Sequence, residues 1–246
     1  MEQILDAMEP HHSTYLSDEA WVDKPWRERP KRPMDILFDH VAQAPAIFNQ
    51  VQALRSLQPH EVLPATLQII TKCWEMDDKL RLFYDNLESS SLGPLYWPEF
   101  SKAESIFPVA FHFSDLNTAN MLMLYWTTLT MLWSGLSKLY ELLSSLAQIE
   151  MDSGGIYDSS PSYHISLLRP LDHRVRYISM ARNVCQSVEY CIQDQMLGFG
   201  PSTAVAPLTI LTETLRDDPD FAGEMLWIKE TFKTIDDQGI KILSHI

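Results

Sequence analysis

LNTANMLMLYWTTLTMLWSGLS, residues 116–137, is a run of 22 residues without one charged side chain. Such a run predicts either a membrane span or a helix buried on nearly every side, because both remove apolar side chains from water. The polar residues favour the buried helix: Asn, Thr and Ser interrupt the run, Lys138 and Glu141 continue its helical pattern, and no basic cluster flanks it. We therefore expect a buried central helix and no membrane partner.

The composition indicates a globular chain that does not need disulfides or a structural metal for stability. Of 246 residues, 46% are hydrophobic, which suffices for a large core. The three cysteines, Cys73, Cys185 and Cys191, lack C-x-x-C spacing and predict buried thiols rather than disulfides or a zinc site. His11 and His12 are adjacent but have no third ligand in view, so we expect no metal and no cofactor.

The charge of the chain opposes direct nucleic-acid binding. A net charge of -14 repels phosphate, whereas binding needs clustered Lys and Arg. One basic stretch, KPWRERPKRP (residues 24–33), lies in a proline-rich region that we expect to be a flexible arm over residues 1–33. Two interpretations of this stretch stay open: a solvated linker, or a patch for nuclear import or phosphate contact.

Apolar residues spaced three and four apart predict an all-α domain over residues 34–246, with antiparallel helix pairs around the central helix. We expect Asp35 to cap a helix interrupted at Pro45, and a turn from Pro59 to Pro64 to precede the next helix. We expect the charged residues of that helix, Asp77 among them, to lie mostly on its outer side.

Asp115 should cap the central helix. The remaining expected elements are a loop over 150–172, a helix from 174 stopping near Gly198 and Gly200, and helices over 205–215 and 221–235.

Two aromatic stretches could be read as strands, LYWPEF (residues 95–100) and FPVAFHF (107–113). Both are short, and an unpaired strand leaves its backbone donors without acceptors. We therefore expect irregular packing here rather than a sheet.

No familiar catalytic motif occurs: the nucleophile elbow, phosphate-binding loop, dinucleotide turn and H-E-x-x-H zinc helix are all absent from the sequence. We accordingly predict no catalytic residues. The competing hypothesis is a small all-helical enzyme acting on a lipophilic metabolite, with His112, Asp115 or His173 as acid and base. Capping by Asp115 and packing of His112 explain the same residues without chemistry.

Methionine and tryptophan side chains gather in the central run. Met121, Met123, Trp126, Met131 and Trp133 could form either ordinary core or the walls of a pocket for a small apolar effector, because thioether and aromatic groups adapt to varied ligands. Both interpretations stay open at this point, and the candidate effector-pocket residues are Met121, Trp126, Met131 and Trp133.

The chain resembles the C-terminal regulatory region of fungal zinc-cluster transcription factors over residues 34–246. The residues that carry the resemblance are dispersed: Tyr96, Trp97, Pro98, Phe111, Phe113, Asp115, Tyr125, Trp126, Cys185, Gln186, Ser187, Val188, Glu189, Tyr190, Gly200 and Pro201.

The resemblance implies an all-helical regulatory module of a nuclear regulator of RNA polymerase II transcription, often dimeric and working with protein partners. Members of that family read DNA through six cysteines that hold two zinc ions. This chain has three cysteines in total. We therefore expect regulation through partners and no direct DNA contact by this polypeptide.

Overall fold

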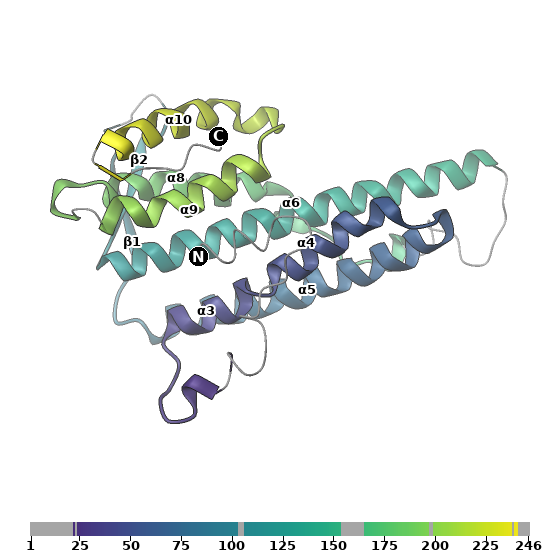
Figure 1. Cartoon of the computed structure of the whole chain (residues 1–246), viewed down its shortest axis with the longest axis horizontal. Coiled ribbons are helices and arrows are strands. Elements are labelled where there is room, and N and C mark those ends of the chain that lie inside the picture. The colour runs from purple at the N-terminus through teal and green to yellow at the C-terminus, as the bar shows by residue number, and fades with distance from the viewer. Residues whose placement is uncertain are drawn as a thin grey trace.

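The fold is all-α and forms one domain built around a central helix, as predicted (Figure 1). The computed structural model describes residues 22, 24–102, 106–153, 165–196, 199–237 and 239–240. Within them lie seven α-helices and one two-stranded sheet. Most of the predicted arm (1–33), including His11 and His12, lies outside the described residues, as does much of the predicted loop.

The central helix is α6 (Leu116–Ser153), which contacts helices on both sides (Figure 1). Every residue from Met121 to Ser134 is buried, so the run sits inside protein on all sides. Burial costs its three buried threonines little because each of their hydroxyls donates to a carbonyl four residues back: Thr127 to Met123 at 2.7 Å, Thr128 to Leu124 at 2.8 Å and Thr130 to Trp126 at 2.9 Å. None of the helices in the described ranges has the length and apolarity that crossing a membrane requires.

Asp115 caps α6 as predicted. Its carboxylate accepts the backbone N–H of Thr118 at 2.9 Å and the Thr118 hydroxyl at 3.0 Å. Partial burial acts to raise the pKa of Asp115, but these hydrogen bonds and one from Ser114 outweigh burial and lower it below the ordinary value. The cap fixes where the central helix begins.

On one side of α6 lie α3 (Pro33–Val41), α4 (Ala44–Ala53) and α5 (Pro59–Ser90). The predicted interruption exists, but it lies at Ala42 and Gln43 rather than at Pro45, which stands in the first turn of α4. Asp35 is not the N-cap of α3. It stands three residues inside, where its carboxylate accepts the backbone N–H of the true N-cap, Arg32, at 3.0 Å.

The predicted turn from Pro59 to Pro64 is wrong, because α5 begins at Pro59 and runs through Pro64. Proline at the first helical position loses no hydrogen bond, and Pro64 near the same end forfeits one at most. Glu61 supports this start by accepting the backbone N–H of Gln58 at 2.9 Å. The helix α5 then runs antiparallel to α6, since Trp74 meets Tyr140 while Tyr84 meets Tyr125.

The expectation of irregular packing for the two aromatic stretches is also wrong. They pair as an antiparallel hairpin, β1 (Tyr96–Phe100) and β2 (Val109–Phe113), with Tyr96 opposite Phe113 and Pro98 opposite Phe111. Each stretch supplies the other's missing partner, and a two-stranded ladder accepts a proline at its edge. The hairpin gains further stability because β2 packs on α6 and α8, which leaves Phe113 buried.

Two helices cover the other side of α6, α8 (Tyr177–Cys191) and α9 (Phe199–Thr214), and α10 (Ala222–Asp237) packs on these two (Figure 1). The helix before Gly200 stops at Cys191, earlier than predicted, and Gly200 belongs to the start of α9. A Cβ on Gly200 would overlap the Cys191 carbonyl oxygen, so the close contact of α8 and α9 explains this glycine. Short 3-10 turns complete the chain at Lys24–Trp26, Leu54–Ser56, Asp172–Arg176, Asp194–Met196 and Pro219–Phe221.

Candidate functional site

The four predicted effector-pocket residues do not share one cavity. Trp126 and Trp133 line the same pocket, whereas Met131 lines a second cavity and Met121 a third, open groove. The reason is helical geometry: positions five apart point about 140° away from each other, while positions seven apart nearly coincide. Met123 lies elsewhere again, with its sulfur 3.6 Å from the Cys191 thiol.

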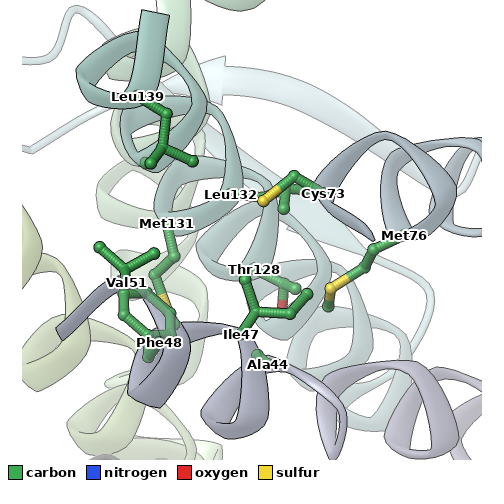
Figure 2. A pocket seen from close by; sticks show the side chains of 11 residues that line it. Ala44, Ile47, Phe48, Val51, Cys73, Met76, Thr128, Met131, Leu132 and Leu139 are labelled. Carbon is green, nitrogen blue, oxygen red and sulfur yellow. The ribbon is translucent and has the colours of Figure 1, made fainter. Parts of the chain in front are cut away.

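The cavity at Met131 is small and apolar. It measures about 30 Å³ and lies where α4, α5 and α6 meet, with Ile47 and Phe48 facing Met131 and Cys73 (Figure 2). The hydroxyl of Thr128 reaches its wall, but that hydroxyl already donates to the Leu124 carbonyl. A space with so few polar partners holds water poorly, so we call it the apolar cavity and interpret it as a packing defect.

The pocket at Trp126 and Trp133 is larger and of a different character. It measures about 310 Å³, at the lower end of the range of ligand pockets, and we call it the tyrosine pocket. Its aromatic wall comes from α5, β1 and α6. Tyr84 stacks on Tyr125 with ring centroids 5.2 Å apart, and Tyr96 meets Trp126 edge-on at 5.3 Å. These geometries are the favoured ones for aromatic pairs and present fixed, flat surfaces.

A buried ion pair forms the polar part of the tyrosine pocket. Asp77 is 2% exposed and Arg174 4% exposed. Arg174 donates to Asp77 Oδ2 through Nε at 2.9 Å and Nη2 at 2.5 Å, while Trp133 Nε1 donates to Oδ1 at 2.7 Å. Both carboxylate oxygens are therefore satisfied, which buried charges require. The three residues come from α5, α6 and the turn before α8.

A second set of contacts fixes the chain around Arg174. The guanidinium carbons of Arg169 and Arg174 lie 4.3 and 4.5 Å from the centre of the Trp74 ring. Arg169 also donates to both oxygens of Asp78, at 2.9 and 3.0 Å, and its carbonyl accepts the Tyr140 hydroxyl at 2.6 Å. Residues 169–174 are thus held against α5 and α6 by cation–π contacts and ion pairs.

The tyrosine hydroxyls of the pocket stay protonated. Burial raises the pKa of Tyr84 to about 12, helped by Tyr96 and Glu88, and burial likewise raises the pKa of Tyr96 and, more strongly, of Tyr125. No hydrogen bond joins these three hydroxyls to another group within the described parts of the chain. They can act as donors to a ligand or to water.

The three residues of the competing enzyme hypothesis each have a different contact. His112 Nε2 lies 3.3 Å from Glu99 Oε2, Asp115 is engaged in its cap, and His173 packs edge-on against Trp133 at 5.3 Å. Only His173 lines the tyrosine pocket.

The three cysteines are buried, and a lysine of the basic stretch forms an ion pair. All three thiols are buried, and burial raises the pKa of Cys73 to about 12, that of Cys191 to about 11 and that of Cys185 further, which disfavours the thiolate. The burial of Cys73, Cys185 and Cys191 confirms the prediction of buried thiols. In the basic stretch, Lys31 pairs with Asp39 at 2.5 Å. Among the described residues, no three His, Cys, Asp or Glu side chains converge as metal ligands.

Sequence reasoning missed the polar half of the tyrosine pocket, because Asp77 is buried rather than on the outer side of α5. A signal existed: Asp77 follows Cys73 and Trp74 at spacings of four and three, on the apolar stripe itself. A charged residue in such a stripe requires a buried partner, but the sequence does not reveal that the partner is Arg174, 97 positions away.

Comparison of the chain with family models, curated proteins and solved structures finds no match. Function is therefore argued from the residues and geometry of this chain.

Proposed function

We propose that this chain is an effector-responsive regulatory domain of a fungal transcription regulator that acts in the nucleus through protein partners. One observation carries the proposal: the tyrosine pocket lies where separate parts of the fold meet. Tyr84 comes from α5, Tyr96 from the hairpin, Trp126 from α6, Arg174 from the turn before α8 and Asn183 from α8. A ligand there contacts all of these elements and can bias their arrangement.

Two further features support this function. The carriers of the sequence resemblance include Tyr96, Tyr125 and Trp126, which are all pocket residues. The net charge of -14 also favours action through proteins over direct contact with DNA.

The test is a reporter assay with the full chain fused to an unrelated DNA-binding domain. We expect transcription to change, up or down, relative to the DNA-binding domain alone. A matched pair sharpens the test: Trp126→Leu alters the pocket wall and should change the reporter output, whereas Trp227→Leu, which contacts Phe107 and does not line the pocket, should alter it less. Equal reporter output with and without the fused chain, at equal expression, would contradict the proposal.

A further inference from the structure

The polar lining of the tyrosine pocket offers donors in excess. Both oxygens of Asp77 already accept hydrogen bonds, so its carboxylate has little capacity left. The remaining groups can donate: three tyrosine hydroxyls, the Asn183 amide and the Arg81 guanidinium all line the pocket. The hydroxyls and the amide can also accept, but Arg81 can only donate, so a ligand with an acceptor group suits this lining.

The charged residues that line the tyrosine pocket favour a ligand with a negatively charged acceptor group. Asp77 and Arg174 neutralise each other, which leaves Arg81 as the second cation of the lining. The side chain of Arg81 is 62% exposed, and its contact with Asp78 is long, at 3.4 Å. Asp78 is already held by two shorter hydrogen bonds from Arg169. Arg81 therefore has guanidinium N–H groups to offer, and its planar fork matches a carboxylate.

The walls and the volume select a flat, small ligand. The stacked Tyr84 and Tyr125 rings, with Trp126 beside Tyr96, present aromatic faces and edges that favour another ring. A cavity of about 310 Å³ suits a ligand of one or two fused rings rather than a long chain or a nucleotide.

We propose that the tyrosine pocket binds a small aromatic carboxylate, with its ring among the tyrosine and tryptophan side chains and its carboxylate on Arg81 at the solvent-exposed side. This inference names the effector class of the regulatory domain proposed above and takes its biological meaning from that proposal. Binding itself is measured on the purified chain and does not depend on transcription.

The experiment is calorimetric titration of the purified full chain with naphthoate and with its neutral counterpart, naphthylmethanol. We expect naphthoate to bind about twofold to fivefold more tightly, because only the carboxylate forms an ion pair with Arg81, and an ion pair with an exposed side chain is worth up to about 1 kcal/mol. Arg81→Gln should bring naphthoate down to the affinity of the alcohol. Tyr125→Phe should weaken naphthoate by about threefold to tenfold, the effect of one neutral hydrogen bond.

Matched controls separate the pocket from general effects of charge. Arg216→Gln removes another exposed arginine, one that pairs with Glu213 outside the pocket, and Tyr190→Phe removes a hydroxyl away from it. Both should bind naphthoate as the unaltered chain does. Equal affinity for naphthoate and the alcohol, an equal loss in Arg216→Gln, or no measurable binding of naphthoate would overturn the ligand class. Any of these results would leave the reporter test of regulatory function standing.

Discussion

The two cavities beside α6 differ in what surrounds them. The apolar cavity, at Met131 and Leu132, is bounded by apolar side chains and by Thr128, whose hydroxyl is already hydrogen bonded within its own helix (Figure 2). The tyrosine pocket, at Trp126 and Trp133, is about ten times larger and contains a buried ion pair with three tyrosines. Apolar packing alone stabilises a helix such as α6, and a buried ion pair is a costly alternative to apolar residues. This contrast is the reason why we interpret the first cavity as incidental to packing and propose the second as a ligand site.

The largest effect is expected from Asp77→Ala, on the side of the tyrosine pocket. The substitution leaves Arg174 buried without its carboxylate, which should lower the free energy of unfolding by about 3–5 kcal/mol. Urea denaturation measures this loss. The double variant Asp77→Ala/Arg174→Met removes both charges and should recover part of it. A loss below about 1 kcal/mol, the value of an exposed pair, would contradict the buried network.

The next effect belongs to the apolar cavity. Met131 is 5% exposed, and Met131→Ala should lower the free energy of unfolding by about 3 kcal/mol by enlarging the existing void. Affinity for naphthoate should not change once the protein is folded, because Met131 does not line the tyrosine pocket. A variant that loses stability and naphthoate binding in parallel would show that the two cavities are not independent.

A glycine on the wall of the apolar cavity offers a smaller, stabilising change. Gly135 lies within α6, and a Cβ built there meets nothing within 4 Å outside the helix. Gly135→Ala should raise the free energy of unfolding by about 1 kcal/mol, since glycine in a helix interior costs that much relative to alanine. Gly200→Ala is the contrasting control and should destabilise, because its Cβ overlaps the Cys191 carbonyl. Destabilisation by Gly135→Ala would show that the cavity wall has no room for a methyl group at this position.

The smallest effect concerns pH and His40, on α3. Burial lowers the pKa of His40 below 6.5; Lys79 and Lys31 act in the same direction, and Asp39 opposes them. The folded chain therefore prefers neutral His40. Its contribution to stability is complete above pH 6.5, declines as the pH falls through the window between the unfolded and the lowered folded pKa, and then levels off.

The variant His40→Gln isolates this contribution. Thermal melts between about pH 7 and pH 5, a range that spans the ordinary histidine pKa, should show a shallower loss of stability in the variant than in the unaltered chain. Identical slopes would assign the acid sensitivity to other groups.

The sequence predicts the elements with strong local signals and misses those that depend on distant partners. The central helix and the Asp115 cap follow from an uncharged run and a capping residue, both visible within a few positions. The hairpin is not predicted because neither stretch has a strong strand signal alone, and each forms a strand only by pairing with the other. The pairing of Asp77 with Arg174 was missed for the same reason, since two separate segments must meet before either charge is satisfied.

The four candidate effector-pocket residues, which all lie on α6, show the same limit of prediction from sequence. Trp126 and Trp133, seven positions apart, share the tyrosine pocket, whereas Met121 and Met131 face other surroundings. Composition singled out a helix that lines the tyrosine pocket, but helical phase decides which of its side chains meet, and the other aromatic residues of the pocket, Tyr84 and Tyr96, come from other elements.

Crystals of the full chain soaked with naphthoate provide the most direct test of the difference between the two cavities. We predict density for the naphthyl ring between Tyr125 and Trp126, with the carboxylate on Arg81 and the apolar cavity at Met131 unchanged. Density in the apolar cavity, or naphthoate bound only outside both cavities, would contradict the assignment of the tyrosine pocket as the site.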